Sequence, residues 1–353
     1  MRRLPVYFLI DVSESMAGEP IEQVQEGMRT IIQELRQDPY ALETVYVSII
    51  AFAGKAKQLS PLTELFKFYP PTFPIGGGTS IGIGLNKLMD CMDDEVVKTT
   101  VEAKGDWKPI IFLFTDGVPT DNYSKAIERW KNHYSRHCNL ISISIGDNAD
   151  TNILKELSDN CFTLNDTDEQ SFKQFFRWIT ASIKTTSMSV ANVGDDDLSL
   201  ASIDGINLTK NGTYPINSRI DENFVIIPAK CQETKKMYLI KYAKRGPVAE
   251  EIEAIRWMQE FKDKFKLVGA YPINEKEYYS LSDGFPTNRN ISTEQLIGRP
   301  TCPCCGNQYG MVICECGNIF CVGEDGHSEC PWCGMEGELT IGEGSSDITR
   351  GRG

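Results

Sequence analysis

Five residues near the start of the chain, Asp11 to Ser15 (DVSES), place one carboxylate and two serine hydroxyls at alternate positions. They follow an apolar, β-rich block at residues 4–10 and precede a long amphipathic run at residues 20–37. That order predicts a buried strand, a polar turn and a helix, and ligands bind at such turns in open α/β sheets. Oxygen donors of this kind suit a hard cation such as Mg²⁺.

Two later loops supply further oxygen donors. A glycine-rich loop at residues 74–78 leads into Thr79, and a buried-strand pattern at residues 108–114 is followed by Thr115 and Asp116. The carboxyl ends of strands in sequential βα units share one edge of the sheet, so these donors should meet the first loop. The sequence therefore predicts one cation site made by five residues: Asp11, Ser13, Ser15, Thr79 and Asp116. A simpler alternative is that the two serines only cap the first helix.

Strand and helix patterns alternate through the first half of the chain. Residues 45–52 and 140–145 are apolar, β-rich runs typical of buried strands. Apolar residues recur at helical spacing in three segments: 20–37, 81–89 and 171–185. This alternation predicts an α/β fold, a doubly wound domain over residues 1–187 with a mostly parallel central sheet.

The five oxygen donors, in this order, resemble the metal-ion-dependent adhesion site (MIDAS) of von Willebrand factor type A (VWA) domains. The resemblance implies a Rossmann-like fold in which Ser13, Ser15 and Thr79 contact Mg²⁺ (or Mn²⁺ or Ca²⁺). It also implies that Asp11 and Asp116 act directly or through water, and that an Asp or Glu of a partner protein completes the coordination. Hydroxyl ligands leave most of the cation's charge uncancelled, which favours an incoming carboxylate.

Catalytic alternatives fit these residues less well. A haloacid-dehalogenase-type phosphatase needs a second Asp where Ser13 stands. Residues 78–82 spell a GxSxG nucleophile elbow, but prolines and glycines precede them instead of a strand. His133 and His137 lie four apart on an expected helix end, where solvated side chains are the simpler interpretation. A metal-dependent phosphoryl-processing enzyme that uses the Asp11 cluster therefore stays the alternative, without an evident base or nucleophile.

Eight of the twelve cysteines lie between Cys302 and Cys333. Two CPxCG knuckles stand at residues 302–306 and 330–334, and each lets two thiolates reach one Zn²⁺. We expect a zinc ribbon with four ligands: Cys302, Cys305, Cys330 and Cys333. A second zinc ion, or a different choice of ligands, stays open for the remaining candidates: Cys304, Cys314, Cys316, Cys321 and His327.

The segment between the N-terminal α/β domain and the cysteine-rich end is less distinctive. Residues 224–227 and 237–242 suggest an antiparallel pair of strands, and residues 249–264 have a helical pattern. In the cysteine-rich part, residues 311–322 suggest a hairpin. The expected division is a VWA domain (1–187), a small mixed α/β segment and linker (188–298), a zinc-ribbon-like domain (299–340) and a disordered tail (341–353).

Charge and hydropathy exclude several classes of function. The formal net charge of −13 disfavours nucleic-acid binding, because affinity for phosphate backbones comes from clustered Lys and Arg. No apolar run approaches about 20 residues, so we expect neither a membrane span nor a secretion signal. Clustered cysteines without such a signal favour metal binding in the cytoplasm over disulfides.

The order of parts and the terminal CPWCG at residues 330–334 resemble the TerY family of bacterial tellurite-resistance and stress proteins. The resemblance implies a cytoplasmic, non-enzymatic adaptor for protein–protein interaction. It also implies that the partners include, in some members, a protein kinase and a phosphatase.

Overall fold

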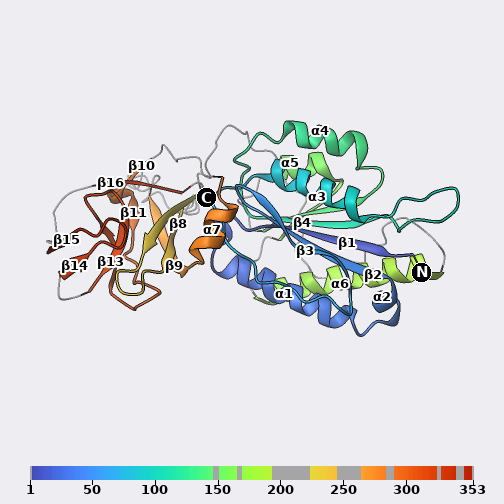
Figure 1. Cartoon of the computed structure of the whole chain (residues 1–353), viewed down its shortest axis with the longest axis horizontal. Helices are drawn as coiled ribbons and strands as arrows, with labels where there is room; N and C mark the ends of the chain where they lie inside the picture. Colours follow the sequence, from blue (N-terminus) through green and yellow to red (C-terminus); the bar gives the residue numbers. More distant parts are fainter. Residues whose placement is uncertain are drawn as a thin grey trace, which may run out of the picture.

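The computed structural model describes residues 2–145, 151–164, 169–192, 223–244, 264–283, 290–323, 327–338 and 346–351. The helix expected over residues 249–264 lies almost wholly outside these ranges. The described residues form two sheet-based domains that lie side by side (Figure 1).

The N-terminal sheet has six strands in the order β3-β2-β1-β4-β5-β6. They are β1 (Leu4–Asp11), β2 (Val45–Phe52), β3 (Ala56–Glu64), β4 (Ile110–Thr115), β5 (Asn139–Ile145) and β6 (Asn160–Leu164). All neighbouring strands are parallel except β2 and β3. This arrangement confirms the predicted doubly wound α/β fold.

Helices cover both faces of this sheet (Figure 1), with α1, α2 and α6 on one face and α3, α4 and α5 on the other. They are α1 (Glu19–Leu35), α2 (Pro39–Thr44), α3 (Ile81–Glu95), α4 (Ser124–His133), α5 (Thr151–Leu157) and α6 (Glu169–Asn192), and a 3₁₀ turn, η1 (Glu14–Met16), precedes α1. Side chains alternate along β1, so Val6 and Phe8 pack with α1 and α6, while Tyr7 and Leu9 pack with α3 and α4.

The C-terminal sheet also has six strands, in the order β11-β9-β8-β7-β13-β12. They are β7 (Phe224–Lys230), β8 (Met237–Lys244), β9 (Phe265–Pro272), β11 (Leu296–Ile297), β12 (Tyr309–Ile313) and β13 (Ile319–Val322). The pairs β7–β8 and β12–β13 are antiparallel, which confirms both predicted hairpins. The chain also forms α7 (Glu275–Leu281), a 3₁₀ turn η3 (Thr293–Gln295) and four short strands: β10 (Asn290–Ser292), β14 (His327–Glu329), β15 (Glu336–Glu338) and β16 (Asp347–Thr349).

Two of the expected boundaries are wrong. Strand β13 pairs with β7 in parallel, so segments 188–298 and 299–340 contribute to one sheet instead of forming separate units. Strand β16 pairs with β10, so residues 347–349 of the expected disordered tail are part of the fold. Both differences arise from strand pairing between segments distant in sequence, which periodicity within one segment does not report.

No helix within the described ranges is long and apolar enough to cross a membrane.

Candidate metal centres

The first candidate centre lies at the carboxyl end of β1, where hydrogen bonds link the predicted oxygen donors. The amide of Ser13 donates to Asp11 Oδ1 (2.9 Å), which folds the loop back on the strand end. The hydroxyls of Ser13 and Ser15 lie 2.9 Å apart, and Ser15 Oγ donates to Asp116 Oδ1 at 2.7 Å. Because β1 and β4 are parallel neighbours, the residues that follow them share one edge of the sheet.

Thr79 completes this group from the loop before α3. Its amide donates to Thr120 Oγ1 (2.9 Å), and the amide of Thr120 donates to the Thr79 carbonyl (2.7 Å). A Cβ placed on Gly117 would lie 3.3 Å from Thr79 Oγ1 and 3.5 Å from Ser15 Oγ, so both hydroxyls face this glycine. The structure therefore brings together Asp11, Ser13, Ser15, Thr79 and Asp116, which we call the oxygen cluster.

The electrostatics of the oxygen cluster favour a cation. Asp11 and Asp116 are both buried. Burial, with a smaller contribution from the nearby Asp116 charge, raises the pKa of Asp11 to about 7. Burial likewise raises the pKa of Asp116, although Lys241 opposes this shift. Two buried carboxylates surrounded by hydroxyl oxygens match the donor set that a hard divalent cation prefers, and such a cation would stabilise their charged forms.

Several residues around the oxygen cluster were not singled out from the sequence. Thr115 Oγ1 donates to Asp11 Oδ2 (2.6 Å) and holds that carboxylate, and Thr120 positions Thr79. Both threonines lie in the polar TDGVPT stretch after the expected strand, so composition held a signal for them. Glu14 is buried and Lys241 reaches the same loop from β8, and no local spacing indicated either contact.

The second candidate region contains two groups of four thiols in the C-terminal domain. Within each group the sulfur atoms lie within 4.8 Å of one another. The first group, the inner thiol cluster, is Cys231, Cys302, Cys305 and Cys321. The second, the outer thiol cluster, is Cys314, Cys316, Cys330 and Cys333.

The predicted zinc set of Cys302, Cys305, Cys330 and Cys333 is therefore wrong as one site. The two CPxCG knuckles belong to different clusters, because they approach opposite ends of the β12–β13 hairpin. Cys314 and Cys316 lie at the turn of this hairpin and join the second knuckle. Cys321 lies on β13 beside the end of β7, where the Gln232 amide donates to its sulfur (3.3 Å), so it joins the first knuckle.

The backbone forms four similar turns around these thiols. Three end in a glycine with positive φ: Gly306 (82°), Gly317 (83°) and Gly334 (74°). Each glycine amide donates to the carbonyl of the first cysteine in its turn. In the fourth turn Lys235 replaces the glycine, with φ of 57°, and its amide donates to the Cys231 carbonyl (3.0 Å). Residues 231–235 (CQETK) lack the proline, the second cysteine and the glycine of a CPxCG knuckle, so the sequence did not reveal Cys231 as a ligand candidate.

Replacing Lys235 with Gly should stabilise the C-terminal domain by about 1 kcal/mol, because an L-residue is strained at positive φ. The ion pair lost with Glu329 spans 3.6 Å on the surface and contributes little. Chemical denaturation of the zinc-loaded protein measures the change. Lys236→Gly is the matched control and should destabilise the domain, since Lys236 does not have a positive φ.

The thiols fit Zn²⁺ by number, spacing and environment. Closed sites of four cysteines are structural, because no coordination position is left for a substrate. Hydrogen bonds from the side chain and amide of Asn318 lower the pKa of Cys316 to about 6. Burial raises the pKa of Cys231, but hydrogen bonds from Thr234 outweigh it and hold this pKa at about 7. These two thiols lose their protons readily, whereas burial raises the pKa of Cys305 to about 11, so that thiol loses its proton only as the metal binds.

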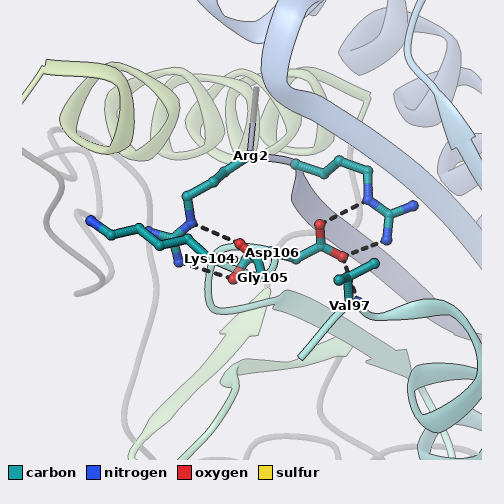
Figure 2. Close-up of a pocket in the computed structure, with 6 residues that line it drawn as sticks. Arg2, Val97, Lys104, Gly105 and Asp106 are labelled. Atoms are coloured by element: carbon teal, nitrogen blue, oxygen red, sulfur yellow. Dashed lines mark hydrogen bonds and ion pairs between the residues drawn. The ribbon is translucent and has the colours of Figure 1, made fainter. Parts of the chain in front are cut away.

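A hollow of about 430 Å³ lies at the amino end of β1, and it does not resemble a binding site. Figure 2 shows Arg2 and Asp106 across it. Arg2 donates to the carbonyls of Gly105 (2.8 Å) and Asp106 (3.1 Å), and Arg3 pairs with the Asp106 carboxylate. These charged groups satisfy one another and fix the loop before β4.

Comparison with protein families identifies both domains. Residues 6–178 match the von Willebrand factor type A domain, and residues 221–353 match the TerY-C metal binding domain. The protein is a VWA domain joined to a TerY-C domain. These matches confirm the VWA resemblance and the TerY-like C-terminal part, and the TerY-C domain includes the strands that we had separated from the cysteine-rich end.

The chain is also similar to individual proteins over part of its length. It is 24% identical over 158 residues to inter-alpha-trypsin inhibitor heavy chain H1 of Bos taurus, covering 43% of this chain and 17% of that one. It is 28% identical over 165 residues to heavy chain H2 of Sus scrofa, covering 44% and 17%. The match thus spans about a sixth of each relative. The structure of the ArnB paralog VWA2 from Sulfolobus acidocaldarius aligns at 17% identity with a TM-score of 0.39, covering 52% of this chain and 45% of that one.

Proposed function

We propose that this protein is an adaptor whose VWA domain binds a partner protein through a divalent cation. The ligands would be Asp11, Ser13, Ser15, Thr79 and Asp116, and the cation would be Mg²⁺, with Mn²⁺ or Ca²⁺ as substitutes. An Asp or Glu of the partner would complete the coordination. The observation that carries this proposal is the hydrogen-bonded chain from Asp11 through Ser13 and Ser15 to Asp116.

Binding accounts for the oxygen cluster better than catalysis does. In the described residues the oxygen cluster is built from carboxylates and hydroxyls, the Lys241 ammonium donates to the Ser15 carbonyl, and no histidine or cysteine joins them. A phosphoryl-processing enzyme would need a positioned general base or nucleophile beside the cation. Cation-dependent turnover of a phosphoester that disappears in Asp11→Ala would favour the enzyme instead.

The TerY-C domain would hold one Zn²⁺ in each thiol cluster and form a rigid platform for a second contact. A scaffold of this kind suits a cytoplasmic stress or tellurite-resistance system that includes a protein kinase and a phosphatase. These partners and this compartment follow from the TerY resemblance, and the two thiol clusters support the platform.

Asp11→Ala should abolish Mg²⁺-dependent capture of the partner, because it removes a buried carboxylate of the oxygen cluster. Affinity capture from cell extract, with Mg²⁺ and with chelator, measures the effect. Asp94→Ala is the matched control, since it removes the same charge from the exposed surface of α3. If the same protein is captured equally by both variants, while circular dichroism shows both folded, the adaptor mechanism is wrong.

A further inference from the structure

The TerY-C domain covers the oxygen cluster of the VWA domain. From β8, Lys241 Nζ donates to the carbonyls of Ser15 and Ala17, the latter at 3.3 Å. From α7, the Tyr278 hydroxyl donates to the Glu14 carboxylate. Figure 1 shows α7 between the two sheets, at the carboxyl end of β1.

Further contacts extend this cover over the glycine-rich loop. The Gly77 amide donates to Ser282 Oγ (2.9 Å), just after α7, and the Lys55 amide donates to the Leu281 carbonyl (2.7 Å). The Leu281 side chain is 2% exposed and packs into the core beneath the VWA sheet. Polar and apolar contacts together thus hold α7 on the loops that build the oxygen cluster.

With the TerY-C domain docked, the oxygen cluster is closed to other molecules. The fractional exposures of its members are 0% for Asp11, Ser13 and Ser15, 1% for Thr79 and 5% for Asp116. A carboxylate of a partner protein cannot reach a cation there while the TerY-C domain occupies this face. Partner binding therefore requires the two domains to separate at this surface.

The TerY-C domain places Lys241 at this face. Its positive charge would compete with a metal cation instead of coordinating it. Lys241 is 3% exposed and lies 4.7 Å from the centre of the Phe224 ring. An ammonium group has no lone pair for a metal, but it offsets the negative charge of nearby carboxylates, and its field opposes the rise that burial causes in the pKa of Asp116. A divalent cation in the oxygen cluster would take the same role and repel the ammonium.

We propose that the TerY-C domain is an internal occupant of the VWA metal-site face, and that its docking through Lys241 opposes divalent-cation binding. Cation binding then weakens the docked arrangement by the same factor by which docking weakens cation binding. The partner carboxylate reaches the cation only in the undocked form. This inference rests on the cation site of the proposed function.

Mn²⁺ titration of the zinc-loaded full chain, followed by electron paramagnetic resonance, tests the competition. Lys241→Met keeps most of the side-chain volume and removes the charge, so it should bind Mn²⁺ about tenfold more tightly or better than the wild type. Lys244→Met is the matched control on the exposed end of β8 and should leave the affinity unchanged. Equal Mn²⁺ affinities for the wild type and Lys241→Met would overturn the inference.

Hydrogen exchange on the wild-type chain provides a test without mutation. Saturating Mn²⁺ should speed exchange at the Gly77 amide, which donates to Ser282, and along α7. Unchanged protection at both places when Mn²⁺ is bound would show that the docked form tolerates the cation, and the inference would be wrong.

A double variant separates this inference from the proposed function. Adding Asp11→Ala to Lys241→Met should abolish Mn²⁺ binding. If binding persists, the cation site is elsewhere and both proposals are wrong. If Asp11→Ala abolishes binding but Lys241→Met has no effect, the cation site holds and only the internal occupant is refuted.

Discussion

Replacing Cys321 with Ser should unfold most of the TerY-C domain and leave the VWA domain folded. Cys321 is fully buried on β13, next to the end of β7, and belongs to the inner thiol cluster. Structural zinc contributes about 10–16 kcal/mol to the folding of small domains. That contribution exceeds or equals the whole stability of a typical domain, about 5–15 kcal/mol, so a damaged site should not support the β7–β13 pairing.

Elemental analysis and limited proteolysis measure this effect. The wild type should contain two zinc ions per chain, and Cys321→Ser should retain one or none and be cleaved within residues 223–351. Cys304→Ser is the control, because Cys304 lies outside both thiol clusters, and it should keep two ions and resist cleavage. A Cys321→Ser protein with both ions and a protected C-terminal domain would contradict the assignment of the clusters.

Replacing Phe176 with Ala should cost the VWA domain about 3–5 kcal/mol of its free energy of unfolding. Phe176 on α6 is 1% exposed and stacks on Phe114 of β4, with ring centres 6.0 Å apart. Its ring also fills the space over Gly27 of α1, where an added Cβ would lie 2.1 Å from the ring. Gly27→Ala should therefore cost about 1–3 kcal/mol through overpacking.

A double-mutant cycle tests whether this contact joins α1 to α6. In the Phe176→Ala background, Gly27→Ala should lose its cost or become stabilising, since the methyl group fills the vacated space. Chemical denaturation followed by the tryptophan fluorescence of the VWA domain gives the four free energies. Glu26→Ala, on the exposed side of α1, is the control. Additive costs would show that the two residues do not share this contact.

The oxygen cluster could be predicted because its signals are local. Each donor directly follows a buried-strand pattern or a glycine-rich loop, and the rule that parallel strands align their carboxyl ends places the donors together. Thr79 could be predicted from its position directly after the glycines. The same strand patterns predicted the doubly wound sheet that β1 and β4 form.

The thiol clusters and the covering domain could not be predicted because they depend on distant pairings. Cys231 joins the inner thiol cluster only because β13 lies beside β7, and its turn, CQETK, shares only the first cysteine with a CPxCG knuckle. Strand β16 is three residues long and exists through its partner β10. The sequence does show Lys241 as a charged residue in the middle of the apolar strand MYLIKYAK. It does not show which residues Lys241 faces.

The oxygen cluster should bind one divalent cation. The most direct measurement is the number of Mn²⁺ ions bound to the zinc-loaded full chain, counted by electron paramagnetic resonance, in the wild type and in Asp11→Asn. Asparagine keeps the shape of the side chain and removes its charge, so we expect one bound Mn²⁺ in the wild type and none in the variant. Equal binding in the two proteins, or no binding in the wild type at millimolar Mn²⁺, would contradict it.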